Sequence, residues 1–379
     1  MQILFWGSLA FIFYVFIGYP IIISLFALGR PARSVRDLAD EELPGVSLII
    51  AAYNEEAHIE RKLRNSLELD YPPEKLTVIV GSDGSTDATN EIVEKFDSER
   101  IRFSPFSVRR GKMAVVNDGV AQAQTEICVF TDVSELFDRN AIRKLVRNFQ
   151  DPSVGSVTGN HIYNPSSSEL AKGVRMYWLY QRWLQKMESR VATIMSCDGT
   201  IYACRRNLFE APPVGIINDD KAVPWKILEK GKRIVFEDEA VARGDALSDT
   251  RSFFRQKVRG QAGMHQLFSM FKSLFWPRDP MRWFIFMSHA VGPVFVPWFV
   301  VILLLSNVML LDKSPYNFFS IVQCIFYLGA TGGVFAQRYK KNIPILHIPY
   351  IFTVSNLASI CGFLAFLFKT QKATWTKVE

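Results

Sequence analysis

Four long stretches without a charged residue limit how this chain can fold more than any other feature of its sequence. They run over Ile3–Leu28, Trp283–Leu311, Ser314–Gln337 and Asn342–Phe368. A helix of about 20 apolar residues crosses the roughly 30 Å core of a bilayer, and each stretch is longer than that. Charged residues are dense only between the first two stretches. We therefore expect a soluble domain enclosed by membrane-spanning helices.

The predicted segments follow from these boundaries. In chain order they are a transmembrane helix at 1–30, a soluble α/β domain at 44–250, an amphipathic interfacial segment at 251–282, three transmembrane helices at 283–368 and a tail at 369–379. The first stretch is too long for a cleaved signal peptide, and no basic residue precedes it.

The positions of the basic residues predict the orientation in the membrane. Clusters follow the first stretch, precede the second and follow the third: Arg30, Arg33, Arg36, Arg278, Arg282, Arg338, Lys340 and Lys341. If the spans alternate, all three clusters lie on one side, which the positive-inside rule makes cytoplasmic. We expect a multi-pass protein of the cell membrane with its soluble domain in the cytoplasm. The tail, with Lys369, lies on the other side unless the fourth stretch, interrupted by Pro344 and Pro349, is re-entrant. The sequence leaves both possibilities open.

The formal net charge of +7 does not indicate a nucleic-acid-binding protein. Seven basic residues and one acidic residue lie between Arg251 and Arg282, in a segment that is also rich in aromatic residues. A basic, aromatic segment beside a membrane span is typical of a helix on an anionic lipid surface. Membrane lipids, and not nucleic acid, are therefore the expected partners of this segment.

The soluble block begins with alternating strand and helix patterns. Apolar runs predict buried strands at 46–52, 75–82, 101–106 and 126–132. Helical patterns lie between them, beginning at Asn54, within DATNEIVEKF and at Met113. Such alternation predicts an α/β, Rossmann-like domain with a mostly parallel sheet.

Polar clusters follow three of the predicted strands: Ala52–Glu55, Asp83–Ser85 and Thr131–Asp132. Ligands bind at the carboxyl ends of strands in such sheets, so we expect the clusters to share one crevice. Arg110 and Lys112 flank the start of a helix and can oppose a diphosphate. A carboxylate such as that of Asp132 suits a hard divalent cation. A nucleoside diphosphate with a metal ion is the simplest ligand for this set. GxGxxG and GxxxxGK[ST] motifs are absent from the sequence.

Four ordered motifs carry a family resemblance. VSLIIAAYNEE, GSDGSTDAT, GKMAVVNDG and VFTDVSELFD are similar to those of inverting family-two glycosyltransferases with a GT-A fold. Within that family the chain most resembles membrane synthases of the cellulose, chitin, hyaluronan and poly-N-acetylglucosamine type. The similarity extends from about Val46 to Gln266.

The resemblance implies roles on the donor side. Asp83 would hold a uracil ring in a pocket that Ala52, Tyr53 and Glu55 line, and Lys112 would lie near the donor diphosphate. Asp132 matches the first acid of the metal-binding DxD motif and would bind Mg²⁺ or Mn²⁺. Ser134 stands at the third DxD position, which puts the affinity and identity of the metal in doubt.

The resemblance also implies a catalytic base and an acceptor site. In Asn218-Asp219-Asp220 the second acid, Asp220, would be the base, and Asp198, Gly199, Asp219 and Trp178 would border the acceptor. A further motif, Gln-x-x-Arg-Trp, clamps the diphosphate. Gln256 and Arg259 match it, but Gly260 replaces its tryptophan, which weakens an expectation of processive synthesis.

The expected reaction is transfer of a sugar from a nucleotide-diphosphate donor, UDP-linked by the resemblance, to a saccharide or lipid-linked saccharide. Extracellular or capsular polysaccharide synthesis is the expected context, with an export partner that the sequence does not reveal. Two alternatives stay open. The first is a polyprenyl-phosphate glycosyltransferase, against which Gln256 and Arg259 argue. The second is a non-catalytic nucleotide-sugar-binding subunit, which Ser134 and Gly260 suggest.

Overall fold

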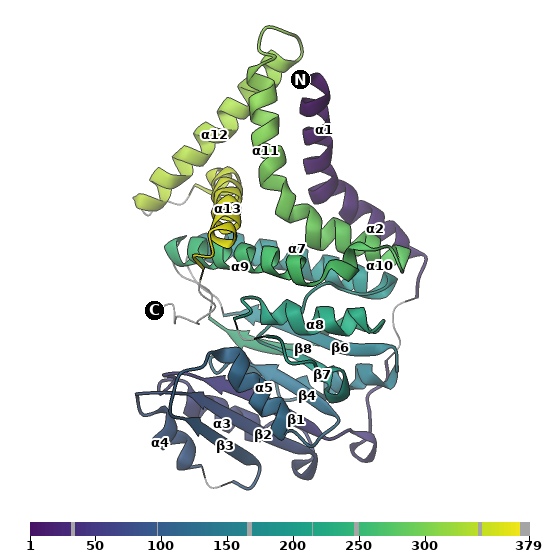
Figure 1. Cartoon of the computed structure of the whole chain (residues 1–379), viewed down its shortest axis with the longest axis vertical. Coiled ribbons are helices and arrows are strands. Elements are labelled where there is room, and N and C mark those ends of the chain that lie inside the picture. Colours follow the sequence, from purple (N-terminus) through teal and green to yellow (C-terminus); the bar gives the residue numbers. More distant parts are fainter. Residues whose placement is uncertain are drawn as a thin grey trace. The chain divides into compact units, whose positions relative to one another are not determined.

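The computed structural model consists of two compact units. It describes residues 1–31, 35–96, 98–164, 169–213, 215–245, 250–339 and 343–371. The helical unit contains Met1–Gly29, Ser166–Gln181 and Leu247–Gln371; the α/β unit contains Arg30–Pro165 and Arg182–Ala246 (Figure 1). Helix α7 (Glu169–Val191) contributes to both. Arg33, Lys340, Lys341 and the tail beyond Gln371, which entered the predicted orientation, lie outside the described residues.

The strands of the described residues form one eight-stranded sheet in the order β3-β2-β1-β4-β7-β6-β8-β5. The strands are β1 (Val46–Ala52), β2 (Leu76–Asp83), β3 (Ile101–Phe106), β4 (Ile127–Thr131), β5 (Leu136–Phe137), β6 (Val154–Tyr163), β7 (Tyr202–Arg205) and β8 (Arg233–Gly244). The first four in this order pair in parallel. Beyond them β7 pairs antiparallel with β4 and β6, β6 pairs parallel with β8, and β5 pairs antiparallel with β8. The predicted mostly parallel α/β sheet is therefore confirmed, with a mixed half that was not predicted.

Helices of the α/β unit connect these strands. They are α3 (Ile59–Leu67), α4 (Thr89–Glu94), α5 (Lys112–Gln122), α6 (Ala141–Val146), α8 (Asp219–Glu229) and the 3₁₀ turns η2 (Asp40–Glu42), η3 (Pro73–Lys75), η4 (Arg147–Gln150) and η5 (Arg206–Leu208). Alternate residues of the buried strand β1 face two layers. Leu48 and Ile50 join a core that includes Ile59 and Leu63 of α3, whereas Ile49 meets α5 at Gly119.

Two local features depart from a simple strand-and-helix pattern. Helix α3 begins at Ile59, later than the predicted start at Asn54. The amides of Asn54, Glu55 and Glu56 instead donate to side chains of the 85–89 segment, and Asn54 has a φ of 52°. The second feature is Pro105 in β3, which the sheet accommodates because β3 is an edge strand.

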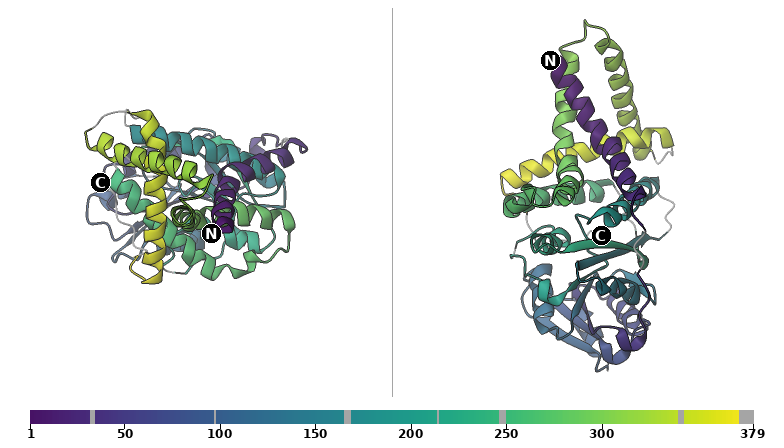
Figure 2. Two further views of the ribbon diagram at one scale, coloured as in Figure 1. Left: turned by 90° about the horizontal axis from the view of Figure 1, so that it is seen from above. Right: turned by 90° about the vertical axis from the view of Figure 1, so that its right-hand side faces the viewer.

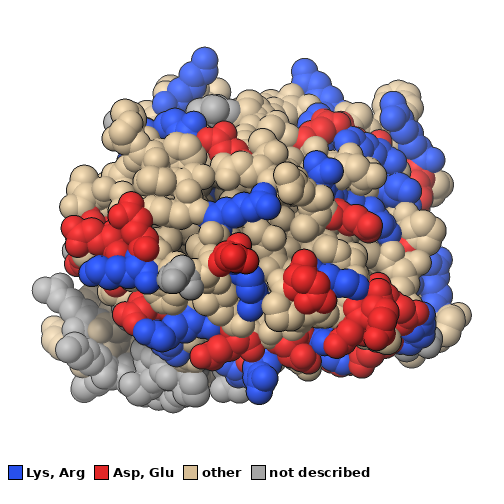
Figure 3. Space-filling model, turned by 90° about the horizontal axis from the view of Figure 1, so that it is seen from below, with Lys and Arg blue, Asp and Glu red and all other residues tan. Residues whose placement is uncertain are grey.

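The charges on the visible face of Figure 3 are mixed. Lysine and arginine side chains alternate with aspartate and glutamate, and the residues described there form no broad area of one sign. Exposed ion pairs such as Arg64 with Glu60 also place opposite charges side by side on the α/β unit. A nucleic-acid-binding face would instead gather basic residues.

The helical unit contains, among the described residues, four helices long and apolar enough to cross a membrane: Gln2–Leu28, Pro280–Val308, Tyr316–Gln337 and Ile345–Leu367. Their elements are α1 (Gln2–Phe13), η1 (Tyr14–Gly18), α2 (Tyr19–Leu28), α10 (Pro280–Ile285), η7 (Phe286–Val291), α11 (Gly292–Val308), α12 (Tyr316–Arg338) and α13 (Pro344–Leu367). Helices α1 and α11 pack together, with the rings of Phe11 and Phe299 stacked 4.1 Å apart.

The predicted interfacial segment contains α9 (Thr250–Met270) and the 3₁₀ turn η6 (Lys272–Phe275). Helix α9 packs closely on α13, because a Cβ at Gly362 would lie 2.7 Å from the carbonyl oxygen of Val258. Helix α13 is continuous through Pro349. It runs across α1 and α11: it is seen end-on in Figure 1, where they stand upright, and lies level in the right-hand view of Figure 2.

Candidate active site

The donor-side candidates lie where strands of the parallel half end. Asp83 is the last residue of β2 and is buried. Its two carboxylate oxygens accept hydrogen bonds from the backbone amides of Arg110 and Gly111, at 2.7 and 2.8 Å. The carboxylate therefore fixes the segment that leads into α5. A base N–H would have to share these oxygens, so the predicted uracil contact of Asp83 stays a prediction.

The end of β1 places an aromatic ring beside the same segment. Ala52 is the buried last residue of β1, and Tyr53 follows it. The guanidinium carbon of Arg109 lies 3.8 Å from the centroid of the Tyr53 ring, a cation–π contact. Glu55 is buried, and its amide donates to the hydroxyl of Thr89. The predicted pocket residues Ala52, Tyr53 and Glu55 are thus adjacent to one another.

A charged cluster joins three motifs that are far apart in the sequence. Nζ of Lys112, the first residue of α5, lies 2.6 Å from a carboxylate oxygen of Asp132 and 3.9 Å from one of Asp219. Burial alone would lower the pKa of Lys112, but Asp132, Asp219 and Asp220 raise it above its usual value. Burial raises the pKa of Asp219 against the opposing effect of Lys112, and Asp220 and Asp132 raise it further. The ammonium of Lys112 therefore faces the negative charge of these three aspartates.

The acceptor-side candidates gather at the first turn of α8. Asp219 and Asp220 begin this helix, and Lys221 Nζ lies 3.1 Å from a carboxylate oxygen of Asp220. Gly199 faces Asp220, because a Cβ at position 199 would lie 3.5 Å from Cβ of Asp220. Asp198 accepts hydrogen bonds from the amide and hydroxyl of Thr200, which keeps its own loop in place. The structure therefore brings these four predicted residues together.

Sequence reasoning missed two buried bases behind the Asp132 turn. Nε2 of His161 lies 2.8 Å from Glu135, and its Nδ1 lies 3.7 Å from Asp198. Burial lowers the pKa of His161, but the imidazole's interaction with the carboxylate of Glu135 and the charge of Asp198 outweigh it and raise the pKa. Lys62 is the second base, and its Nζ donates to Thr131. A lysine on the apolar face of α3 was the available signal.

The oxygen ligands near Asp132 fit a divalent cation held jointly with a diphosphate. Magnesium ions commonly take one or two protein carboxylates and complete their shell with phosphate oxygens and water. Asp132 offers such a carboxylate, and Ser134 is exposed, although its hydroxyl donates to Glu135 at 3.1 Å. Lys112 occupies one side of the Asp132 carboxylate. A bound cation and Lys112 would both be attracted to this carboxylate.

A second acidic group does not suit a metal as well. Glu237, Asp238 and Glu239 of β8 have carboxylate oxygens within 4.8 Å of one another. Glu237, however, forms a two-bond ion pair with buried Arg147, and Glu239 also pairs with Arg147. These carboxylates already have a cationic partner, so we interpret the group as structural.

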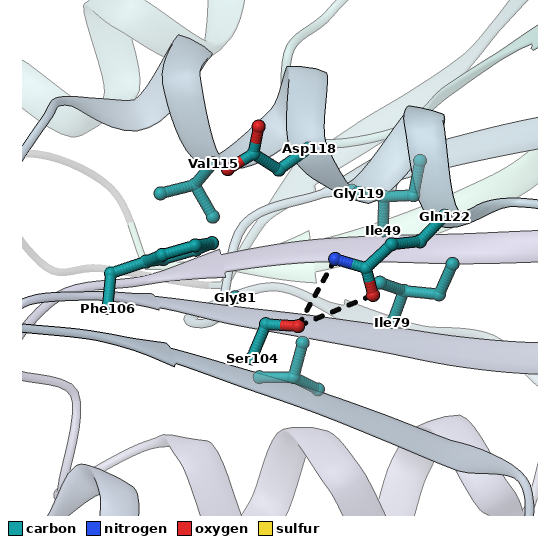
Figure 4. A pocket seen from close by; sticks show the side chains of 10 residues that line it. Ile49, Ile79, Gly81, Ser104, Phe106, Val115, Asp118, Gly119 and Gln122 are labelled. Carbon is teal, nitrogen blue, oxygen red and sulfur yellow. Dashed lines mark hydrogen bonds between the residues drawn. The ribbon is translucent and has the colours of Figure 1, made fainter.

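A narrow crevice beside α5 is separate from these residues. Figure 4 shows its lining, which includes Phe106, Val115 and the hydrogen-bonded pair Ser104 and Gln122. The crevice is too narrow to admit a water molecule. It does not represent the ligand site.

Three predicted residues belong to the helical unit. Gln256 and Arg259 lie in α9, and Trp178 lies in the part of α7 assigned to that unit. Nε of Arg259 is buried and has no hydrogen-bond partner among the residues that the structure describes. The roles of these three residues stay predictions.

Comparisons with known proteins agree with this geometry. Residues 47–211 match the family model "Glycosyl transferase family 2". The chain is 28% identical over 278 residues to a poly-beta-1,6-N-acetyl-D-glucosamine synthase of Staphylococcus aureus (strain COL), covering 71% of this chain and 66% of that protein. It thus spans about two thirds of that relative's length. It is 25% identical over 370 residues to the synthase of the same name from Staphylococcus epidermidis, covering 89% and 88%.

A solved structure shares the fold. It is a mannosyltransferase of Pyrobaculum calidifontis in complex with GDP-Man and Mn²⁺, with a TM-score of 0.73 and 23% sequence identity. The match covers 97% of this chain and 100% of that chain. The sheet described above has the GT-A arrangement predicted from the motifs. The α/β unit therefore has the GT-A fold, and residues 47–211 of the chain are similar to family-two glycosyltransferases.

Proposed function

We propose that this protein is a membrane-bound, inverting glycosyltransferase that moves a sugar from a nucleotide-diphosphate donor to a saccharide acceptor. The observation that carries the proposal is the cluster of Lys112, Asp132 and Asp219. It joins a cation for the diphosphate, a carboxylate for a metal ion and the acidic start of α8. A transfer of this kind requires these groups close together in one site.

Support for the donor class comes from two sources. The staphylococcal relatives are named as synthases of a poly-N-acetylglucosamine, and the solved mannosyltransferase holds a nucleotide-diphosphate sugar together with Mn²⁺. We infer a UDP-sugar as the donor of this chain, and Mg²⁺ or Mn²⁺ as its metal. Asp132 would hold the cation, with Ser134 as a weak neighbouring ligand. When bound, the cation would neutralise charge on the diphosphate.

The chain's own residues supply the remaining chemistry. Asp220 is our candidate general base and accepts the proton of the attacking acceptor hydroxyl, while Asp198 and Gly199 border the acceptor. Lys112 stabilises negative charge on the departing diphosphate. Its ammonium lies 2.6 Å from Asp132, the carboxylate that we propose holds the cation beside that diphosphate. On the Gln-x-x-Arg motif alone, Arg259 is our candidate for a second cation that binds the diphosphate. Attack by the acceptor in one displacement inverts the anomeric carbon.

Membrane attachment and orientation are part of the proposal. The four long apolar helices anchor the chain, and the basic residues beside them favour a cytoplasmic catalytic domain. Helix α13 runs across α1 and α11 (Figure 2), which favours the re-entrant course of the fourth apolar stretch over a simple crossing. Lys369, just after α13, would then lie on the cytoplasmic side with the other basic residues. Synthesis of an extracellular polysaccharide is the inferred context.

The test is a transfer assay on the purified full-length chain in lipid. UDP- and GDP-sugars are supplied one at a time with Mn²⁺ and an oligosaccharide acceptor; mass spectrometry identifies the products, and NMR gives their anomeric configuration. We expect one donor to yield an extended acceptor with a β linkage from an α-linked donor. A folded protein that consumes none of the donors would contradict the proposal.

A further inference from the structure

Lys62 lies beneath the turn that carries Asp132. Its side chain is fully buried in α3, with an exposed fraction of 0%. Nζ donates to the hydroxyl of Thr131 at 2.8 Å and to the carbonyl oxygen of Glu135 at 2.5 Å. It also lies 4.4 Å from the centroid of the Phe137 ring. Two of the three ammonium donors therefore bind the two ends of the 131–135 segment, and the ammonium also contacts the Phe137 ring.

These contacts reach Asp132 itself. The hydroxyl of Thr131, which accepts from Lys62, donates in turn to the carbonyl oxygen of Asp132 at 3.2 Å. Lys62 thus binds both ends of the 131–135 segment, and one of its bonds continues to the peptide of Asp132. A single side chain can therefore set the position of that carboxylate.

The fold alone does not explain a lysine here. Burial lowers the pKa of Lys62 to about 7, although Glu135 and Asp132 act in the opposite direction. Lys62 makes no ion pair with any residue that the structure describes. Burying an amine without a carboxylate partner is unfavourable, and an apolar side chain of equal length would be less costly. The hydrogen bonds to Thr131 and Glu135 are the interactions that an apolar side chain could not make at this position.

We infer that Lys62 is a positioning residue that holds the Asp132 turn ready for the donor diphosphate. This inference rests on the proposed function. The neighbouring Ser134 supplies no second carboxylate, so Asp132 must meet the cation and Lys112 in one defined position. The buried ammonium restrains that position from below, where it does not compete with the ligand.

The test compares Lys62→Met with a matched variant in the same helix. Met has the same length without a donor. Ser66→Ala removes the buried hydroxyl one turn later, which donates to the carbonyl of Lys62 and does not contact the turn. Hydrogen exchange of the 131–137 amides is measured first, then the affinity for UDP with Mn²⁺. We expect Lys62→Met to raise exchange and to weaken UDP binding, each about tenfold, with a thermal midpoint near that of the wild type. Ser66→Ala should change neither.

Unchanged exchange at 131–137 in Lys62→Met would overturn the inference, whatever the enzyme's activity. Thr131→Val removes the acceptor instead of the donor and should have the same effect; it replaces Lys62→Met if that variant does not fold. The two changes combined should cost little more than Lys62→Met alone, because that change already removes the contact with Thr131. A wild type that binds no nucleoside diphosphate would contradict the proposed function, while the exchange measurement would still decide the role of Lys62.

Discussion

The two halves of the sheet differ in pairing and in the ligand groups they place. Strands β3, β2, β1 and β4 pair in parallel, and Asp83 and Asp132 lie at or just after the ends of two of them. In the half formed by β7, β6, β8 and β5, antiparallel pairs dominate. The residues proposed for the acceptor, Asp198 and Asp220, lie on a loop and a helix start there. If the proposed roles hold, donor binding and acceptor activation depend on two differently built parts of one domain.

The largest effect should come from the acceptor half. Asp220→Asn removes the proposed base but keeps the shape of the side chain. We expect transfer to fall about 10²–10⁴-fold with donor affinity nearly unchanged, because the base acts on the acceptor. Steady-state transfer and calorimetric donor binding measure the two quantities. The matched variant Asp219→Asn keeps Asp220 and should retain more transfer. Equal or larger loss in Asp219→Asn would assign the base to Asp219 instead.

The second-largest effect on transfer should come from the parallel half, where Asp132 is proposed to bind the metal ion. Asp132→Ala is expected to reduce transfer by about 10²–10³-fold and to behave like the wild type in excess chelator, because both lack the charge that opposes the diphosphate. Ser134→Asp places a second carboxylate at an exposed position and should lower the Mn²⁺ concentration needed for activity. The measurement is transfer against metal concentration. Asp138→Ala, which loses an ion pair with Arg243, is the control.

Full activity of the wild type in excess chelator would contradict this prediction. The carboxylate of Asp132 would then serve Lys112 alone. The two halves of the sheet would still differ, but the donor half would contribute the Lys112–Asp132 ion pair and no metal site.

The smallest effect concerns His161 of β6, in the mixed half of the sheet. His161 faces Glu135 and Asp198, with Arg182 as the opposing charge. Its folded pKa is raised, so its stabilising contribution is complete below the unfolded value of about 6.5 and is lost as pH rises through the folded pKa. We expect His161→Gln to cost about 1.5–3 kcal/mol near pH 6 and much less near pH 9.

Thermal unfolding at both pH values measures this difference. His58→Gln, at an exposed position of the same unit, is the control and should show no pH-dependent loss. The same loss for His161→Gln at pH 6 and pH 9 would mean that His161 contributes packing and not charge.

The parallel half was predictable because its signals are local. Val46–Ala52 is apolar except at Ser47, and all seven of its residues are buried. The β8 strand, Arg233–Gly244, resisted prediction because Glu237, Asp238 and Glu239 interrupt it. Those charges are tolerated where Arg147, far away in the sequence, pairs with them. A sequence pattern does not contain such a partner.

The candidate site divides in the same way. The motifs indicated Lys112, Asp132 and Asp220 by residue type and order, but not that Lys112 pairs directly with Asp132. The late start of α3 was missed because side chains from the 85–89 segment bind the amides of Asn54–Glu56. Lys62 and His161 escaped notice because their partners come from other parts of the chain. Contacts that depend on tertiary structure are the part that sequence reasoning did not reach.

The most direct test of the central claim is nucleotide binding by Lys112→Met. The matched control is Lys186→Met, which removes another lysine–aspartate pair, with Asp238, away from the cluster. Calorimetry with Mn²⁺ compares UDP with UMP, and GDP with GMP. We predict that the wild type prefers one diphosphate, and that Lys112→Met loses about 10–100-fold in diphosphate affinity with little change for the monophosphate, since one charged contact is removed. Diphosphate affinity that is unchanged in Lys112→Met, or equally reduced in Lys186→Met, would contradict the account.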